Sequence, residues 1–217
     1  IHSDAKEKID KITQDLTEKE KGSLQNDANI LELKDTKELT VNDLNIKALN
    51  EYYNADKNKA IEYYKKAISL ENDSKVLSNL FCNIGIIFQE LKENKNAITY
   101  YNMAIEKENF DAMNNIANIY FHENINKEES FKLINKSILI NKNWYNIHTL
   151  SIIQIWNEEY KESIKTIEDL INDYDYRKND MIDTFLFLLA KKQNDLLNKL
   201  FEKYSELKDD FKDIYFT

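Results

Sequence analysis

Residues 81–104 read FCNIGIIFQELKENKNAITYYNMA, and this stretch decides the fold because both of its halves repeat small or apolar residues at helical spacing. A polar run, LKENKN at 91–96, separates the halves. The residues that follow the spacing are Phe81, Ile84, Gly85 and Phe88 in the first half and Ala97, Tyr101 and Ala104 in the second. Steps of three and four place such residues on one face of a helix. The stretch therefore predicts two helices joined by a short turn.

Small residues are placed where these two helices must approach closely. A glycine inside a helix costs about 1 kcal/mol relative to alanine, so Gly85 indicates a packing requirement. Ala97 and Ala104 present equally small surfaces from the second helix, and Tyr101 fills the space between them. We expect close helix packing at this point.

The pattern of the second half recurs along the chain. The matching sets are Ala60, Tyr64 and Ala67 upstream, and Ser130, Ile134, Ser137 and Ser163, Ile167, Leu170 downstream. The first members of the four sets are separated by 37, 33 and 33 residues, and the last members by the same steps. Because the first and the last members of the sets recur at the same steps, they indicate a repeated structural unit.

This pattern resembles the tetratricopeptide repeat, which has a period of about 34 residues. The resemblance rests on Phe81-x2-Ile84-Gly85-x2-Phe88-x8-Ala97-x3-Tyr101-x2-Ala104 and on NEEYKESI at 157–164, which is similar to the family's inter-helix turn. It extends over about residues 40–204. The chain departs from the family pattern because the closing proline is absent and serine replaces alanine in two repeats. The resemblance implies an all-α, right-handed superhelical solenoid of about five antiparallel helical hairpins.

The sequence divides into a charged N-terminal helix with its linker, residues 1–29, and a repeat domain, residues 30–217. The predicted hairpins cover about 40–71, 75–108, 111–140, 144–171 and 180–205, and a capping helix covers about 207–216. Thr40 and Asp43 indicate the start of the first hairpin, and Asn126 with Glu129 predicts a capping-box variant in the third.

The N-terminal helix carries a narrow apolar stripe formed by Ala5, Ile9, Ile12 and Leu16, and Gly22 ends it. Two interpretations stay open. The helix either folds back on the solenoid as a solvated arm, or it mediates self-association or partner binding, because the stripe is similar to a short coiled-coil seam.

Composition limits the partners. A net charge of −9 and a pI near 5.0 argue against nucleic acid or an anionic membrane surface. No stretch reaches the ~20 apolar residues of a membrane span, so we expect no direct membrane insertion. The single Cys82 excludes an internal disulfide and fits the cytoplasm. The chain begins at Ile1, so we expect a fragment or processed form, and a removed signal or anchor leaves the compartment open.

Motifs for catalysis are missing. Two distant glycines do not build a phosphate-binding loop, and His2, His122 and His148 lie far apart in sequence. The carboxylates are spread over solvated helix faces, which offers no basis for choosing an acid–base pair. We expect no enzyme activity, no cofactor and no metal site.

The first helices of such hairpins line the concave side of a solenoid. Residues two positions away from the buried face point outward at 100° per residue. The predicted partner-binding groove contains Asn79, Asn83, Ile86, Glu90, Asn115, Asn118, Phe121, His122, Tyr145, His148, Ile152 and Trp156.

Asn83 and Asn115 occupy the same place in adjacent repeats, where their amides could pair with a peptide backbone. This pair resembles the asparagine ladder in the repeats of the O-linked N-acetylglucosamine transferase, although the abundance of asparagine in the chain is an alternative explanation. An apolar, aromatic end of the groove would be formed by Tyr145, Ile152, Ile155 and Trp156, unless some of them pack on the connector or the fifth hairpin. His122 and His148 share this predicted surface, where a pH-sensitive or metal contact is an alternative to plain solvation.

The sequence therefore predicts a non-catalytic scaffold that binds a protein or peptide in its groove. Two alternatives stay open: a structural subunit that self-associates as a homo-oligomer, and a signalling-peptide receptor that regulates a response protein. The carboxylate-clamp subgroup of the family requires basic groove residues, and only Lys47 supplies one, which argues against that function.

Overall fold

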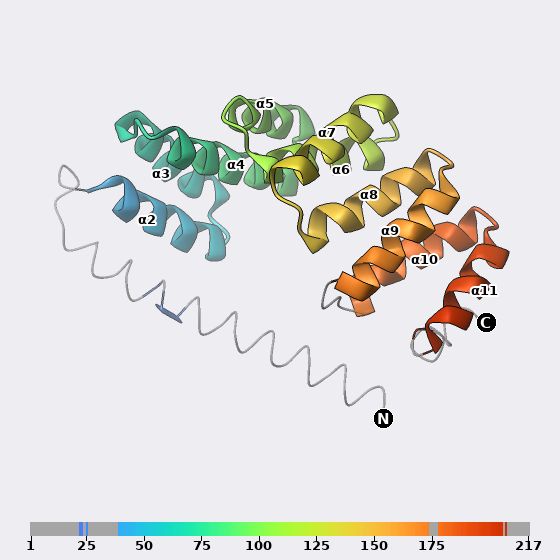
Figure 1. Ribbon diagram of the computed structural model, residues 1–217. Helices are drawn as coiled ribbons and strands as arrows, with labels where there is room; N and C mark the ends of the chain where they lie inside the picture. The colour runs from blue at the N-terminus through green and yellow to red at the C-terminus, as the bar shows by residue number, and fades with distance from the viewer. Residues whose placement is uncertain (1–21, 24, 26–38, 174–177, 206, 208–217) are drawn as a thin grey trace. The chain divides into compact units, whose positions relative to one another are not determined.

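The computed structural model describes residues 22, 23, 25, 39–173, 178–205 and 207, and all regular structure within them is helical. The helices of the described residues, labelled in Figure 1, are α2 (Val41–Tyr53), α3 (Lys57–Leu70), α4 (Ser74–Glu90), α5 (Asn94–Ile105), α6 (Phe110–His122), α7 (Lys127–Ile140), α8 (Trp144–Trp156), α9 (Tyr160–Asp173), α10 (Lys178–Ala190) and α11 (Asn194–Lys203). The predicted all-α fold is confirmed. Of the predicted N-terminal helix and linker over 1–29 and the predicted capping helix over 207–216, all but residues 22, 23, 25 and 207 lie outside the described residues.

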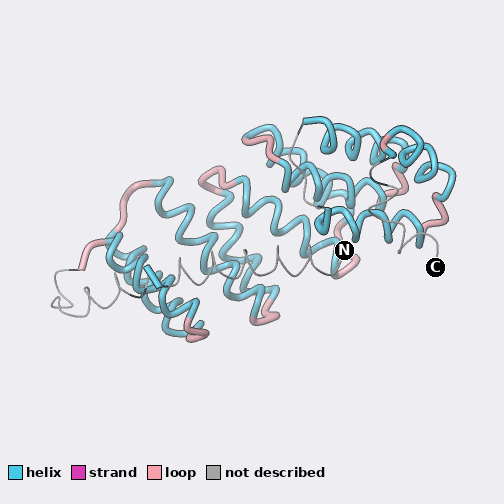
Figure 2. The backbone as a smooth tube through the Cα atoms, turned by 90° about the horizontal axis from the view of Figure 1, so that it is seen from below, coloured by secondary structure: helices cyan, strands magenta, loops and turns pink. Residues whose placement is uncertain are grey.

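The chain forms two compact units, Ile1–Lys107 and Glu108–Thr217. In the first unit, α2 packs on α3 and α4 packs on α5, and α3 contacts α4. In the second unit the pairs are α6–α7, α8–α9 and α10–α11, and α8 contacts both α6 and α10. Figure 2 shows that a short loop joins the helices of each pair. Each unit is therefore a stack of helical hairpins. None of the described helices is long and apolar enough to cross a membrane.

Side-chain caps fix the starts of α2, α3, α4, α6 and α8, as the sequence predicts for α2. The Thr40 hydroxyl accepts a bond of 3.2 Å from the Asp43 amide, and the Asp43 carboxylate accepts one of 2.9 Å from the Thr40 amide. Such a reciprocal cap satisfies two backbone donors that the helix leaves unpaired. Asn109 caps α6 with a bond of 2.8 Å from the Ala112 amide, near the place of the family's closing proline. The capping box predicted at Asn126 is wrong, because this residue has φ 52° and its side chain makes no cap bond.

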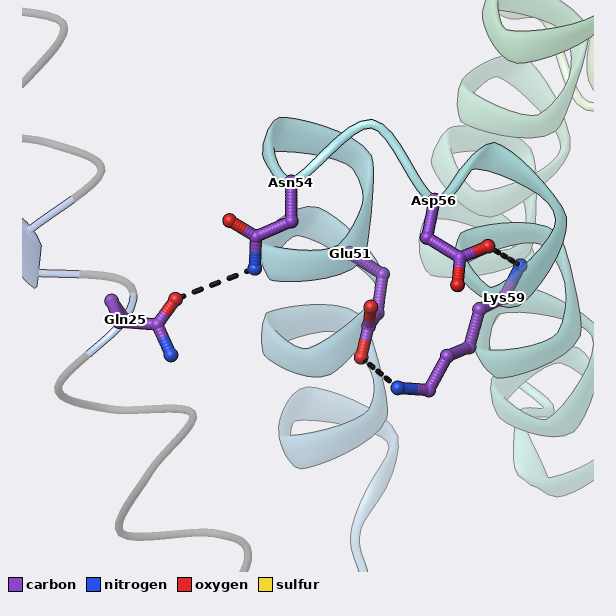
Figure 3. Close-up of polar contacts among 5 residues, drawn as sticks. All are labelled: Gln25, Glu51, Asn54, Asp56 and Lys59. Atoms are coloured by element: carbon purple, nitrogen blue, oxygen red, sulfur yellow. Dashed lines mark hydrogen bonds and ion pairs between the residues drawn. The ribbon is translucent and has the colours of Figure 1, made fainter.

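A set of polar contacts closes the turn of the first hairpin (Figure 3). Asp56 accepts a bond of 3.0 Å from the Lys59 amide, and the Lys59 ammonium forms an ion pair with Glu51 on α2. On the other side of the turn, the Asn54 amide donates to the Gln25 side chain over 3.4 Å. These contacts hold the ends of α2 and α3 together and place Gln25 beside their turn.

The hairpin turns adopt left-handed backbone conformations without glycine. The central residue of each three-residue turn, at Ala55, Lys92, Glu158 and Lys192, has φ between 59° and 67°. The third hairpin has a four-residue turn, 123–126, in which both Asn124 and Asn126 have positive φ. A non-glycine residue in this region costs roughly 1–2 kcal/mol. Packing of the two helices must offset this strain.

Small residues are buried in both helices of a hairpin, near the crossing. In the first unit these are Ala48 and Ala60 in one hairpin and Gly85 and Ala97 in the other, and the three alanines are fully buried. In the second unit, the buried Ser130 hydroxyl donates to the Ala117 carbonyl over 3.0 Å, and the Ser163 hydroxyl donates to the Ser151 carbonyl over 2.9 Å. Serine replaces alanine here without leaving an unpaired buried hydroxyl, because the facing helix supplies an acceptor.

Gly85 gives a direct test of this close approach. A Cβ atom at this position would lie 2.5 Å and 2.6 Å from the Cε1 and Cδ1 atoms of the Tyr101 ring. We expect Gly85→Ala to lower the free energy of unfolding by about 1–3 kcal/mol, although alanine is the better helix former. Urea denaturation followed by circular dichroism measures the change.

Gly22→Ala is the matched control, because a Cβ at Gly22 meets nothing within 4 Å. Equal stability of the two variants would contradict the close approach. The loss of unfolding free energy caused by Gly85→Ala should be smaller when Tyr101 is also changed to leucine, since the two residues share one space.

Candidate functional site

In the first unit, the predicted groove residues lie along one side of α4, which we call the α4 face: Asn79, Asn83, Ile86 and Glu90. Asn79 and Glu90 are exposed, while Asn83 and Ile86 are half-buried. The two asparagines stand one helical turn apart. The α4 face thus presents two amides and one apolar side chain to solvent, and it ends at a carboxylate.

Glu90 connects the first hairpin to the second. The Tyr52 hydroxyl at the end of α2 donates to its carboxylate, and the Lys57 ammonium at the start of α3 lies 2.9 Å away. Partial burial pushes the pKa of Glu90 upward, but the bonds from Tyr52 and Lys57 outweigh it and hold the pKa below its ordinary value. Partial burial and the Glu90 carboxylate raise the pKa of Tyr52, so its hydroxyl stays protonated. The charge of Glu90 is therefore already paired within the unit.

Asn83 has a weaker internal contact. Its amide nitrogen lies 3.4 Å from the Tyr64 hydroxyl on α3, at the long end of hydrogen-bond distances. Burial raises the pKa of Tyr64, and the Asn83 contact opposes this shift. The contact orients the amide at the base of the α4 face.

In the second unit, α6 carries Asn115, Asn118, Phe121 and His122. Asn115 is half-buried, and it precedes Ala117 by two residues, as Asn83 precedes Gly85. Asn118 donates to the Thr149 hydroxyl on α8 over 3.3 Å. His122 is exposed, and its ring lies 5.1 Å from that of Phe121. Since Asn83 and Asn115 belong to different units, a ladder that joins them stays a prediction.

The aromatic end that the sequence predicts on α8 is not open. Trp156 is 5% exposed, since Phe121 packs edge-on against its ring with centroids 5.6 Å apart and the Lys127 ammonium lies over it. Its indole nitrogen donates to the Asn124 side chain over 2.9 Å. Phe121 also contacts Phe187 of α10, with ring centroids 5.5 Å apart. The prediction of an accessible Trp156 anchor is therefore wrong.

The other predicted α8 residues differ in exposure. His148 is half-buried and pairs with the Thr184 hydroxyl on α10 over 2.9 Å. Ile152 is also half-buried, whereas Tyr145 is 41% exposed and its ring contacts Trp144. His122 and His148 thus have separate neighbours. In the described part of the chain, no three His, Cys, Asp or Glu side chains gather where a metal ion could bind.

A sequence signal for the burial of α8 was present. The helix reads WYNIHTLSIIQIW, contains no charged residue and carries apolar residues on every side. A helix of this kind is typically buried all round. In the structure α8 lies against α6, α7, α9 and α10 of the same unit, which leaves little of it exposed.

Equivalent lysines connect successive hairpins in the two units. Lys57 and Lys127 each begin the second helix of a hairpin, three residues before the small residue at the crossing. Each reaches the last residue of the next hairpin's first helix: Lys57 pairs with the Glu90 carboxylate, and Lys127 donates to the Trp156 carbonyl over 2.8 Å. Sequence reasoning missed this contact because it depends on how neighbouring hairpins stack.

Asn114 on α6 is 1% exposed, and neither polar atom of its amide has a hydrogen-bond partner. An unpaired buried amide costs about 1–3 kcal/mol. The equivalent residue of the next hairpin, His148, lies three residues before its small residue and finds the Thr184 hydroxyl. The unpaired amide of Asn114 therefore lowers the stability of the packing around α6.

The sequence profile of the tetratricopeptide repeat matches residues 47–74 and 78–106. These two segments are tetratricopeptide repeats. The matched ranges cover most of α2 to α5, so the profile and the structure locate the same two hairpins. Protein–protein interaction is typical of such repeats.

Solved structures share the fold at low sequence identity. The C-terminal part of a repeat protein of this family from Cytophaga hutchinsonii is 16% identical, with a TM-score of 0.67 over 88% of this chain and 80% of that chain. A tetratricopeptide repeat protein from Parabacteroides merdae is 17% identical, with a TM-score of 0.61 over 81% and 72%. MamA from Desulfovibrio magneticus is 13% identical, with a TM-score of 0.58 over 75% and 91%. The predicted solenoid fold is thus confirmed.

Among curated proteins, reticulocyte-binding protein homolog 1 of Plasmodium falciparum is 28% identical over 189 residues. The alignment covers 76% of this chain and 6% of that protein, so the chain spans only a small part of its length.

The Glu90 contacts predict a pH-dependent contribution to stability. The folded-state pKa of Glu90 lies below the ordinary value of 4.5, so ionised Glu90 stabilises the fold at neutral pH. This contribution is lost as the pH falls from 4.5 through the folded-state pKa. We expect Glu90→Gln to cost about 1 kcal/mol at neutral pH and almost nothing at about pH 2.5. Urea denaturation at both pH values tests this, with the exposed Glu62→Gln on α3 as control. If Glu90→Gln lowers the free energy of unfolding by the same amount at both pH values, the ionised carboxylate does not contribute to stability.

The Lys127 contact gives a second test. We expect Lys127→Met, which keeps most of the aliphatic stem, to cost about 1 kcal/mol through loss of the bond to the Trp156 carbonyl and of the cation–π contact. Lys132→Met on the same helix is the matched control, since this lysine is exposed and pairs only along the helix surface with Glu128. If both variants lose the same stability, the Lys127 contact does not hold the hairpins together.

Proposed function

We propose that the chain is a non-catalytic scaffold that binds a protein partner through the first-helix faces of its hairpins. The observation that supports this most directly is the α4 face, where Asn79 and Asn83 reach solvent and Glu90 is already paired. The protein-interaction role that is typical of tetratricopeptide repeats supports the same assignment.

The spacing of the two amides fits an extended partner. Residues four apart on a helix are separated by about 6 Å along its axis, and alternate residues of an extended chain by about 6.6 Å. Each amide offers one donor group and one acceptor, which a peptide backbone can match whatever its side chains are. A helical partner has already paired its own backbone groups, so these amides favour an extended segment.

Ile86 supplies an apolar contact next to the amides. It is half-buried and follows Asn83 by three residues, so it extends the same side of α4. On α6, Asn115 offers a further amide, and His122 and the half-buried Phe121 present ring surfaces. Each unit thus contributes amides beside apolar or aromatic groups, and we assign partner binding to these side chains rather than to Trp156.

Affinity capture with matched variants tests the proposal. Three forms of the whole chain serve as baits. The first is the wild type, the second (the α4 variant) carries Asn79→Lys and Ile86→Lys, and the third (the α5 variant) carries Asn102→Lys and Met103→Lys. Asn102 and Met103 are exposed, so the α5 variant adds the same charges on a different helix. We expect a partner that the wild type and the α5 variant retain and the α4 variant loses, with circular dichroism showing that all three fold.

Two results would contradict the proposal. Equal retention by the α4 variant would exclude the α4 face as the binding surface. A wild-type bait that retains no partner and is larger than a monomer by light scattering would favour the structural, self-associating role.

A further inference from the structure

Exposed apolar side chains gather where α7 ends and α8 begins. Leu139 is 86% exposed, the highest value among the large apolar side chains of the described residues. Ile140 and Tyr145, which follow it closely in the sequence, are exposed as well. Single exposed apolar residues are common on soluble proteins, whereas a group of them marks an interaction surface.

The exposed leucine is peculiar to α7. The corresponding positions, twelve residues after the start of α3, α5 and α9, hold the polar residues Ser69, Glu106 and Asn172. The neighbouring Ile138 packs against the apolar core of the second unit, so α7 fills its place in the stack without Leu139. Packing of the hairpins therefore gives no reason for a leucine at this position.

Two lysines with unpaired charge flank the apolar side chains. Lys136 lies one turn before Leu139 and Ile140 on the same side of α7, and Lys142 follows in the loop to α8. Both lysines are exposed, and neither forms an ion pair with another described residue. The sequence contains no Asp or Glu between residues 130 and 157, although 39 such residues occur in the whole chain.

The acidic residues at the start of α6 do not neutralise these lysines. The Ser137 hydroxyl of α7 donates to the Phe110 carbonyl over 2.9 Å, so the start of α6 lies against the end of α7. Glu108 and Asp111 flank Phe110, and neither pairs with a lysine of α7 or of the following loop. Burial raises the pKa of Asp111, and no nearby cation opposes this shift. The charges of the two lysines thus remain available to a partner.

We propose that this surface, the α7–α8 junction, binds a segment of a partner protein that carries large apolar side chains next to Asp or Glu. The junction consists of Lys136, Leu139, Ile140, Lys142 and Tyr145. The three apolar residues would remove the partner's apolar side chains from water, and the lysines would pair with its carboxylates. Tyrosine is one of the residues most enriched at binding hot spots.

The charge of the junction argues against a second copy of the chain as the occupant. A two-fold symmetric contact would bring the lysines of both copies to the same interface, and like charges there oppose association. The junction is also separate from the α4 face. The inference therefore goes beyond the proposed function, and either can fail without the other.

The test uses a random twelve-residue peptide library displayed on phage. The whole chain is immobilised, and peptides that also bind the Leu139→Ser variant are removed. Serine is the residue that α3 carries at this position, so the variant should keep the circular dichroism spectrum of the wild type. We expect the retained peptides to be enriched in Asp or Glu together with large apolar residues.

The binding of a synthetic copy of a retained peptide is then followed by fluorescence anisotropy. We expect it to weaken at least about tenfold in Leu139→Ser, and at least about threefold when NaCl is raised from about 50 to 500 mM. Leu70→Ser is the matched control, because Leu70 is 56% exposed at the end of α3. This variant should bind the peptide as the wild type does.

Reversal of the charges separates recognition from structural damage. A second selection on the variant with Lys136→Glu and Lys142→Glu should enrich peptides that contain Lys or Arg in place of Asp or Glu, while the apolar residues stay. A variant with Lys65→Glu and Lys66→Glu on the exposed side of α3 is the control. It should retain the same acidic peptides as the wild type.

Four results would overturn the inference. The first is a library that yields no peptide dependent on Leu139, and the second is a set of retained peptides without enrichment of Asp or Glu. The third is a wild-type mass above that of a monomer by light scattering that Leu139→Ser reduces to the monomer, because the junction would then join copies of the chain. The fourth is binding to phosphatidylserine vesicles that Leu139→Ser abolishes, because the junction would then contact a lipid surface.

Discussion

The close approach of α4 and α5 at Gly85 is the constraint on which the first unit depends. The Tyr101 ring occupies the space that a side chain at Gly85 would need, and its hydroxyl reaches the Gln89 side chain on α4 over 2.7 Å. A helix pair this close excludes water from its crossing and orients the remaining faces of both helices. The orientation of Asn79 and Asn83 toward solvent follows from this packing, so the candidate surface depends on a buried glycine that is not part of it.

The fold could be predicted from the local spacing of small and apolar residues, because each hairpin is defined by residues close in sequence. The range predicted for the first hairpin, about 40–71, agrees with α2 and α3, and the recurring small residues identified the second helices of the pairs. The placement of Trp156 failed because its neighbours Phe121, Asn124 and Lys127 come from the preceding hairpin. Helical periodicity indicates which residues share a face, whereas contacts between stacked hairpins decide which faces stay exposed.

The lysine contacts at the helix ends also restrict where a partner can bind. Lys57 holds Glu90, and Lys127 holds the carbonyl of Trp156, so in both cases the last turn of a first helix is used to join successive hairpins. The earlier turns of α4 keep their polar side chains accessible. The exposed side chains of the middle turns can thus vary without loosening this contact, whereas the buried Ile84 and Gly85 in the same turns cannot.

The left-handed turns have a consequence for how the chain folds. Ala55, Lys92, Glu158 and Lys192 adopt a conformation that they would rarely hold in an isolated peptide, and no glycine relieves the strain. Backbone bonds across each turn, such as the one of 2.9 Å from the Asp56 amide to the Glu51 carbonyl, hold the turns closed together with the packing of each hairpin against the next. A single hairpin released from its neighbours would lose the packing that helps to offset the strain. The smallest piece that folds cooperatively must span more than one repeat, although the sequence repeats hairpin by hairpin.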